Sequence, residues 1–156
     1  MKGKKVFIVF FAIVVVSCSG SYYEKSYTIE NEQWNQDNLL QFNVNVDDIY
    51  ARYNVYINVR NTTDYTYSNI FFFVSVLYPD NFCAIDTVEG ILADPKGKWL
   101  GSGSGRYKNN RFLYKSNIMF PQTGTFVFTI EQAMREQSLQ GIATIGMEVE
   151  KINNPQ

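Results

Sequence analysis

Alternating apolar and polar residues are the clearest pattern in the middle of this 156-residue chain. Leu40 to Val46 places an apolar side chain at every second position, and Tyr53 to Val59 repeats the pattern. A period of two residues is typical of a β-strand that buries one face. The apolar run from Asn69 to Tyr78 instead predicts a central strand that is buried on both faces. Further strands are expected at 82–92, 111–120, 125–130 and 142–149.

These segments predict the fold class. About seven short strands, separated by turn signals rich in Asn, Asp, Pro and Gly, favour a sandwich. We therefore predict an all-β domain over residues 38–152, an antiparallel two-sheet β-sandwich with jelly-roll-like connections. One short helix is expected near the C-terminus, because the residues from Glu131 to Gln137 are all good helix formers. Residues 18–37 are polar and are interpreted as a tether leading into the domain, with Trp34 as an apolar anchor.

A long loop is predicted from Ala93 to Arg106, where four glycines fall between Gly97 and Gly105. Loops of this length are often functional or mobile. The spacing does not match a phosphate-binding loop, because it lacks the Gly-x-x-x-x-Gly-Lys-Ser/Thr pattern and no helix is expected to follow. The loop is therefore either a flexible surface segment or part of a binding site.

The first residues of the chain predict export. Three lysines (Lys2, Lys4 and Lys5) precede the apolar run from Val6 to Val16, as in a secretory signal peptide. This run is shorter than the roughly 20 residues needed to span a bilayer. Val15-Val16-Ser17-Cys18 resembles a bacterial lipobox, which implies that residues 1–17 are removed and that Cys18 is lipidated. The alternative is an ordinary secretory signal that happens to contain a cysteine.

Composition limits the chemistry that the rest of the chain can perform. Histidine is absent, which removes the usual general base near neutral pH and the commonest metal ligand. The formal net charge is −1 and no basic stripe is present, which argues against a nucleic-acid partner. With Cys18 lipidated, Cys83 has no partner for an intramolecular disulfide, and its apolar neighbours predict a small buried side chain. We assign no catalytic residue, cofactor or metal; the alternatives are a hydrolytic carboxylate pair and a calcium ion held by Asp94 or Asp64.

Aromatic residues make up 16% of the chain, and several fall in predicted loops or strand edges. Tyrosine and tryptophan at such positions either stack on sugar rings or cover the edge of the core. Trp99 and Tyr107 flank the glycine-rich stretch and are the candidate contacts for a partner protein or a glycan. They motivate an alternative function, a carbohydrate-binding lipoprotein of the cell envelope.

Short blocks distributed along the chain resemble a known family. They are Trp34-Asn35, 53–61 with Asp64-Tyr65, 69–74, 86–89, 92–95, 98–101, Phe120-Pro121 with 123–125, and 130–135. In this order they resemble the gliding-motility lipoprotein family GldH of the Bacteroidetes, and they cover nearly all of the chain after Cys18. The resemblance implies a non-enzymatic, palmitate-bearing lipoprotein associated with the outer membrane. It also implies an accessory role among envelope proteins linked with gliding or type IX secretion.

Two shorter signals belong with this resemblance. Asp86-Thr87-Val88 resembles the O-glycosylation signal of the Bacteroidetes periplasm, which makes Thr87 a candidate acceptor. Ser19 follows Cys18 where an aspartate would argue against the outer membrane, and no acidic residue comes directly after it. We therefore expect an outer-membrane lipoprotein held through its N-terminal lipid, with the periplasmic face favoured over the cell surface.

Overall fold

A computed structural model describes residues 21–152, which form ten strands and one short 3-10 turn. The elements are β1 (Tyr23–Thr28), η1 (Glu30–Glu32), β2 (Gln33–Asn35), β3 (Leu40–Val46), β4 (Arg52–Thr62), β5 (Asn69–Leu77), β6 (Cys83–Ile91), β7 (Tyr107–Ile118), β8 (Gly124–Gln132), β9 (Ser138–Gln140) and β10 (Ile142–Ile152). The expected signal peptide and Cys18 lie outside the described residues. Within the described range, the structure contains no helix of the length and apolarity that crossing a bilayer requires.

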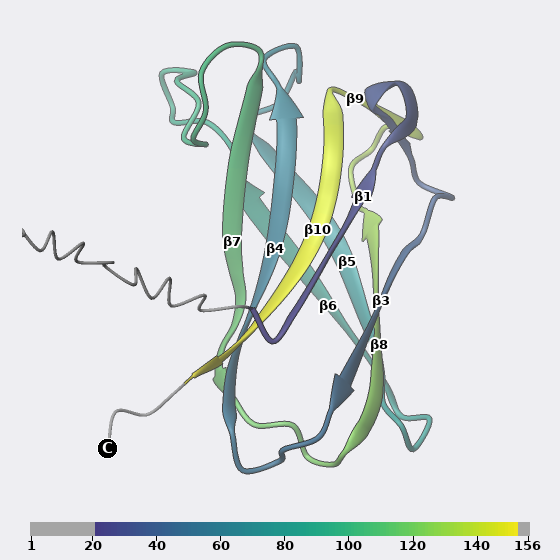
Figure 1. Cartoon of the computed structure of the whole chain (residues 1–156). Helices are drawn as coiled ribbons and strands as arrows, with labels where there is room; N and C mark the ends of the chain where they lie inside the picture. The colour runs from purple at the N-terminus through teal and green to yellow at the C-terminus, as the bar shows by residue number, and fades with distance from the viewer. Residues whose placement is uncertain (1–20, 153–156) are drawn as a thin grey trace, which may run out of the picture.

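The long strands form two four-stranded antiparallel sheets packed face to face (Figure 1). One sheet has the order β1-β10-β4-β7 and the other has the order β3-β8-β5-β6, while β2 and β9 pair separately. Numbered one to eight along the chain, the long strands have the jelly-roll order, 1-8-3-6 facing 2-7-4-5. The predicted all-β sandwich agrees with this arrangement.

The core lies between the two sheets and follows the period-two pattern. In β3, Phe42 and Val44 are fully buried while the intervening asparagines are exposed. β4 and β10 supply the facing layer, including Ile57 and Met147. Burying each such side chain contributes about 1.5–3 kcal/mol relative to leaving it in water. β5 alternates too, with Phe72 buried and Phe73 exposed, so the expectation that it is buried on both faces was wrong.

The predicted helix near the C-terminus is absent from the described residues, so that prediction was wrong. Glu131 and Gln132 instead end β8 and pair with β5, and the next five residues form a bend before β9. The buried Gln132 side chain accepts a hydrogen bond from the Met134 amide (2.9 Å) and donates one to the Glu136 carbonyl (2.6 Å). Seven residues make a marginal helix in isolation, and strand pairing outweighs their helix propensity.

The fold begins earlier than expected, because much of the segment 18–37 belongs to the sandwich. β1 pairs with β10 along its whole length, from Tyr23 opposite Val149 to Thr28 opposite Thr144. Trp34, in β2, is fully buried against Phe72, as its interpretation as an anchor requires. The domain therefore starts near residue 21 rather than at 38.

The outcome for Cys83 in β6 corrects the sequence analysis. Cys83 was expected to be a small buried side chain, yet it is exposed, as is Ile85 on the same face of the strand. The inward positions include Asp86, which binds Tyr114 of β7, and Gly90, which packs against the ring of Phe112. A Cβ on Gly90 would lie 2.7 Å from that ring, so Phe112 leaves no room for a side chain at this position.

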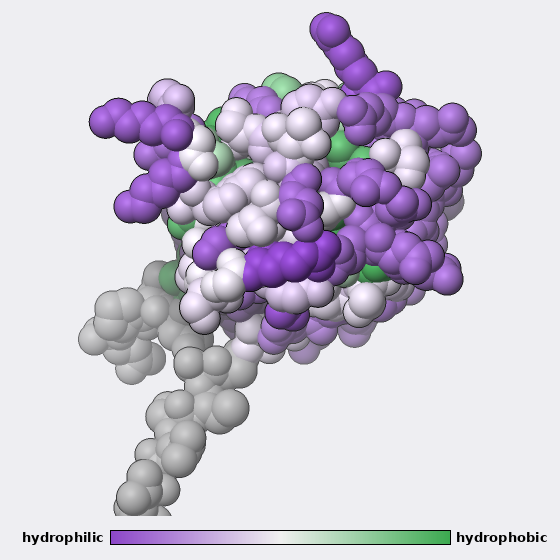
Figure 2. Space-filling view, turned by 90° about the horizontal axis from the view of Figure 1, so that it is seen from above, coloured by the Kyte–Doolittle hydropathy of each residue, from purple (hydrophilic) through white to green (hydrophobic). Residues whose placement is uncertain are grey.

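The loops gather at two ends of the sandwich. We call the end formed by the loops 47–51, 78–82 and 119–123 the lower end, following its position in Figure 1. The upper end comprises η1 and the loops 63–68 and 92–106. Seen from above in Figure 2, the upper end is covered mainly by hydrophilic residues.

Candidate functional site: a charged cluster at the upper end

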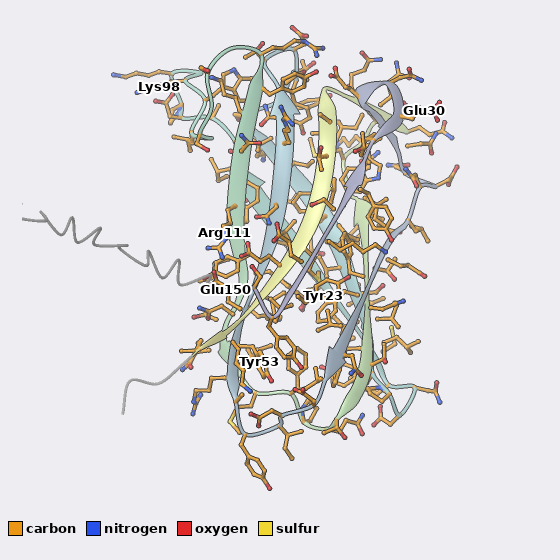
Figure 3. The ribbon with its side chains drawn as sticks, in the orientation of Figure 1. Tyr23, Glu30, Tyr53, Lys98, Arg111 and Glu150 are labelled. Atoms are coloured by element: carbon orange, nitrogen blue, oxygen red, sulfur yellow. The ribbon has the colours of Figure 1, made fainter. Side chains whose placement is uncertain are left out.

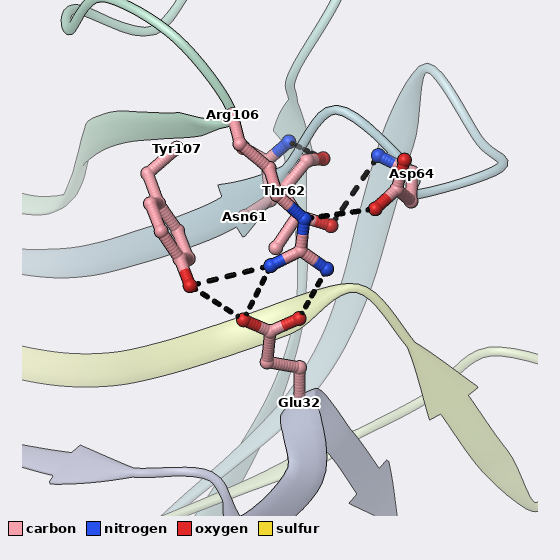
Figure 4. Close-up of polar contacts among 6 residues, drawn as sticks. All are labelled: Glu32, Asn61, Thr62, Asp64, Arg106 and Tyr107. Carbon is pink, nitrogen blue, oxygen red and sulfur yellow. Dashed lines mark hydrogen bonds and ion pairs between the residues drawn. The ribbon is translucent and has the colours of Figure 1, made fainter.

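An arginine joins two acidic side chains at the upper end. Arg106 approaches both carboxylate oxygens of Glu32, at 2.7 and 2.6 Å, and its Nε donates to Asp64 at 3.0 Å (Figure 4). The three residues come from the loop before β7, from η1 and from the turn after β4. The two parallel bonds to Glu32 form a bidentate pair, the strongest geometry available to an arginine and a carboxylate.

Tyr107 completes the cluster. Its hydroxyl donates to Glu32 at 2.8 Å and accepts a bond from Arg106 at 3.2 Å. The guanidinium of Arg60 lies 4.4 Å from its ring centroid and that of Arg106 lies 5.4 Å away. Two cations thus already interact with the ring that the sequence assigned to a partner or a glycan.

The backbone beneath Glu32 is held in an unusual conformation. Asn31 and Glu32 have φ angles of 52° and 56°, in the left-handed region, which costs a non-glycine residue about 1–2 kcal/mol. The Gly141 amide donates to the Glu32 carbonyl at 2.8 Å, and the Thr62 amide donates to the Gly141 carbonyl at 2.8 Å. Main-chain bonds from β4 and from the corner between β9 and β10 therefore fix the carboxylate in place.

The electrostatics of the cluster favour its charged form. Hydrogen bonds from Arg106, and next from Tyr107, hold the pKa of the Glu32 carboxyl below its usual range. Hydrogen bonds to Glu32, and next to Asp64, raise the pKa of Arg106. Glu32 therefore stays ionised at neutral pH and is engaged in ion pairing, which suits a fixed recognition surface better than proton transfer.

Buried amides support the cluster from below. Asn110 donates to the side-chain oxygen of Asn61 at 2.8 Å, and Asn61 donates to the Thr62 carbonyl at 2.9 Å. Gly101 approaches this pair so closely that a Cβ would lie 2.7 Å from the Asn110 side-chain oxygen. The glycine-rich loop is thus packed onto β7, where Ser102 pairs with Asn109, rather than being a flexible surface segment.

A polar groove continues from the cluster down the outer face of the β1-β10-β4-β7 sheet. Its volume is about 400 Å³, and its lining includes Asn58, Arg60 and Arg111. Arg111 binds Glu148 at 2.9 Å and Glu150 at 2.7 Å, and it lies 3.3 Å from the ring centroid of Tyr56 (Figure 3 shows Arg111 and Glu150 on the same face).

The other residues singled out in the sequence lie elsewhere. Trp99 pairs with Ala93 and packs, half-buried, against the core. Thr87 is exposed on β6. Asp94 uses one oxygen to bind the amides of its own loop, and Asp64 binds Arg106. Across residues 21–152, no group of three acidic or cysteine side chains is arranged to hold a metal ion.

Sequence reasoning missed Glu32 and Arg106 and proposed Asp64 only as a calcium ligand. The two members of the bidentate pair are 74 positions apart, and neither lies in a periodic or motif-like stretch. Tyr107 was found because it is an aromatic residue beside a glycine-rich loop. That signal led to the correct end of the molecule but to a different set of contacts.

The sequence matches the family model described as GldH lipoprotein over residues 21–149. A relative named gliding motility lipoprotein GldH homolog, from Christiangramia forsetii, is 35% identical over 157 aligned residues, covering 96% of each chain. A second relative, gliding motility lipoprotein GldH of Flavobacterium johnsoniae, is 29% identical over 147 aligned residues. That alignment covers 90% of this chain and 91% of the relative.

Proposed function

Since this chain belongs to the GldH lipoprotein family, we propose that it acts as a lipid-anchored accessory protein of a gliding or type IX secretion-linked envelope complex. The match to nearly the full length of a gliding motility lipoprotein carries this proposal. The role is to bind other envelope proteins, without catalysis and without a cofactor. We place it at the outer membrane, on the periplasmic face.

The anchor in this proposal is Cys18, which would carry palmitate-type acyl chains after removal of residues 1–17. Growth with a clickable palmitate analogue should label the wild-type protein in the native host. A Cys18→Ser variant should lose the label and leave the membrane fraction, whereas Cys83→Ser should retain both. Labelling of the Cys18→Ser variant would contradict the proposal.

Protease treatment of intact cells tests on which face of the outer membrane the domain lies, because a periplasmic domain is protected.

The protein-binding surface in this proposal is the upper end, comprising Glu32, Arg60, Asp64, Arg106 and Tyr107. Its support is the combination of exposed charge with a backbone fixed by hydrogen bonds, since a preformed surface loses little entropy on binding. Affinity purification from solubilised outer membranes should recover gliding or type IX secretion components with the wild-type chain. Arg106→Gln should reduce that recovery at unchanged expression.

Arg52→Gln is the matched control, because Arg52 is an exposed arginine at the lower end that binds only a backbone carbonyl. It should leave recovery unchanged. Equal recovery with both variants would reject the upper end as the protein-binding surface. Failure to recover any envelope component with the wild-type chain would reject the accessory role itself.

Thr87 remains a proposed O-glycosylation site, supported by its exposure on β6 and by Asp86 before it. Intact mass of the protein from its native host should show an added sugar mass that disappears in Thr87→Ala. A native mass equal to that of the acylated polypeptide would reject the modification.

A further inference from the structure

The lower end carries a group of exposed apolar side chains, one from each of its three loops. Tyr50 is 84% exposed in the loop 47–51, Phe82 is 59% exposed in 78–82, and Met119 is 48% exposed in 119–123. On the adjoining strands, Leu77 and Ile85 are also exposed. Side chains of this kind at three loop tips of one end form a surface that favours a less polar medium than water.

The loops present these side chains in a fixed manner. The Asp48 carboxylate accepts hydrogen bonds from the amides of Tyr50 and Ala51, at 3.0 and 3.1 Å. The Asp80 carboxylate accepts one from the Phe82 amide at 3.1 Å. Each acid therefore fixes the backbone of its own loop, with Tyr50 left largely exposed and the Phe82 ring packed on one side against Tyr78, 5.3 Å between ring centroids.

The described chain begins close to this end. Tyr22 binds the Asn45 carbonyl and the Asp47 carboxylate, both at 2.8 Å, where β3 leads into the loop 47–51. Tyr23 pairs with Val149 near the end of β10, and Figure 3 shows Tyr23 and Tyr53 in the lower half of the sandwich. The polypeptide therefore reaches Cys18 from the lower part of the molecule.

Chain length restricts where an acylated Cys18 can take the domain. Cys18 precedes Tyr23 by five residues, and five extended residues span at most about 17 Å. β4 alone has 11 residues and is roughly 36 Å long. Such a tether can bring the membrane to the lower end but not to the upper end.

The charges at the lower end are of both signs and give no strong preference for anionic lipid, since Asp47 and Asp80 lie there together with Arg52. Lys151 binds Asp48 at 2.8 Å, and Lys115 binds Asp86 at 2.8 Å. Attraction to a bilayer would therefore come from the apolar side chains. Tyrosine is also well suited to the boundary between lipid and water, because its ring is apolar and its hydroxyl is polar.

We propose that the lower end rests in the headgroup region of a phospholipid bilayer, with Tyr50, Phe82 and Met119 entering it beside the lipid on Cys18. This inference rests on the acylation in the proposed function. Acyl chains and apolar loops then act as two joint signals for the membrane. The upper end, with Glu32 and Arg106, is held roughly 35 Å away, about the length of a long strand.

Cys83 offers a direct test, because it is exposed at the lower end next to Phe82 and is the only cysteine besides Cys18. The full acylated chain is labelled at Cys83 with an environment-sensitive dye and reconstituted into phosphatidylcholine vesicles. The emission should shift to the blue, and lipids with a shallow nitroxide should quench it at least twofold. A matched chain with Cys83→Ser and Ser104→Cys carries the dye at the upper end and should show neither change.

A second pair of variants tests the side chains themselves. The triple variant Tyr50→Ser, Phe82→Ser and Met119→Ser should lose most of the quenching at Cys83 while still floating with vesicles. The matched triple Leu39→Ser, Leu100→Ser and Leu113→Ser removes equally exposed apolar groups elsewhere and should keep it. Circular dichroism melts confirm that both variants fold.

The outcomes separate this inference from the proposed anchoring. If the wild-type chain fails to float with vesicles, acylation has failed and the proposed anchor is wrong. If it floats but the dye on Cys83 is not quenched, or is quenched no more than the dye at position 104, the orientation is overturned. A dye that shifts only in native membranes would show that a protein covers the lower end, which also overturns it.

Discussion

Arg106 is the residue on which the candidate site depends, because it balances Glu32 and Asp64 at once. Replacing it with glutamine leaves two carboxylates without their shared cation. We expect Arg106→Gln to raise the pKa of the Glu32 carboxyl towards its ordinary value, since the hydrogen bonds that lower it come first from Arg106. Carbon-detected NMR titration of the glutamate carboxyls measures this shift.

Arg52→Gln serves as the control for that titration, because Arg52 contacts neither acid. It should leave the titration of Glu32 unchanged. A Glu32 titration that is identical in the wild type and in Arg106→Gln would mean that the bidentate pair does not persist in solution.

Gly141 lies behind the same site, at a position where the structure leaves no room for a Cβ. Its φ angle is +86°, and a Cβ would lie 2.8 Å from the Tyr65 backbone. We expect Gly141→Ala to lower the free energy of unfolding by about 3 kcal/mol, through left-handed strain plus crowding. Gly97 has a similar φ of +80° with open space around it, so Gly97→Ala should cost about 1 kcal/mol.

Urea denaturation of the two glycine variants measures both effects. The difference between them isolates the crowding against Tyr65, because the strain is common to both. Equal losses of stability would show that the corner between β9 and β10 relaxes to accept a methyl group.

The strands whose apolar and polar residues alternate were predicted, and β1, which lacks this pattern, was missed. β3 and β4 alternate because water lies on one side and the core on the other, and this periodicity is visible in any sequence. β1 is an edge strand whose exposed positions carry no apolar pattern. Tyr27 in β1 and Tyr22 just before it hold this segment to the other sheet, because their hydroxyls donate to the backbone carbonyls of Gln41 and Asn45 in β3. These hydrogen-bond partners are brought together only by the tertiary fold. The sequence of β1 by itself therefore shows nothing more than a polar segment.

At the end of β8, long-range contacts outweigh the local helix propensity, and this leads to a prediction for that strand. Gln132 is 2% exposed and satisfies the Met134 amide and the Glu136 carbonyl. The Gln132→Leu substitution leaves both groups without a hydrogen-bond partner, so we expect the free energy of unfolding to fall by about 2 kcal/mol. We expect no gain of helix. Chemical denaturation with far-ultraviolet circular dichroism measures both. Gln140→Leu, at an exposed position in β9, should be near neutral, and a new helical signal in Gln132→Leu would contradict this account.

The whole molecule has opposite chemistry at its two ends, and the jelly-roll topology explains why. Because successive long strands run in opposite directions along the sandwich, the loops 47–51, 78–82 and 119–123 lie at one end and the cluster around Arg106 lies at the other. The apolar tips and the ion-paired cluster are thus separated by the full length of the strands. The proposed lipid on Cys18 would convert that separation into an orientation, in which the lower end meets lipid and the upper end meets proteins.

Stability should depend on pH only at the extremes, since the chain contains no histidine. Basic partners lower the pKa of four carboxyls, Glu32, Asp48, Asp86 and Glu148, through Arg106, Lys151, Lys115 and Arg111 respectively. The unfolded chain therefore binds protons before the folded chain as the pH falls. The free energy of unfolding should decline below about pH 4.5, where the unpaired carboxyls titrate.

The stability at alkaline pH depends on the tyrosines, because folding raises their pKa values instead of lowering them. Burial raises the pKa of Tyr22 to about 12 and also raises the pKa of Tyr114. The unfolded chain therefore releases these protons first, and stability should fall above about pH 10. Urea titrations from pH 3 to 11 should show a plateau between about pH 5 and 9. An inflection near pH 7 would contradict this picture. In Arg106→Gln the acid decline should be shallower, because the pKa of Glu32 then differs less between the folded and unfolded states.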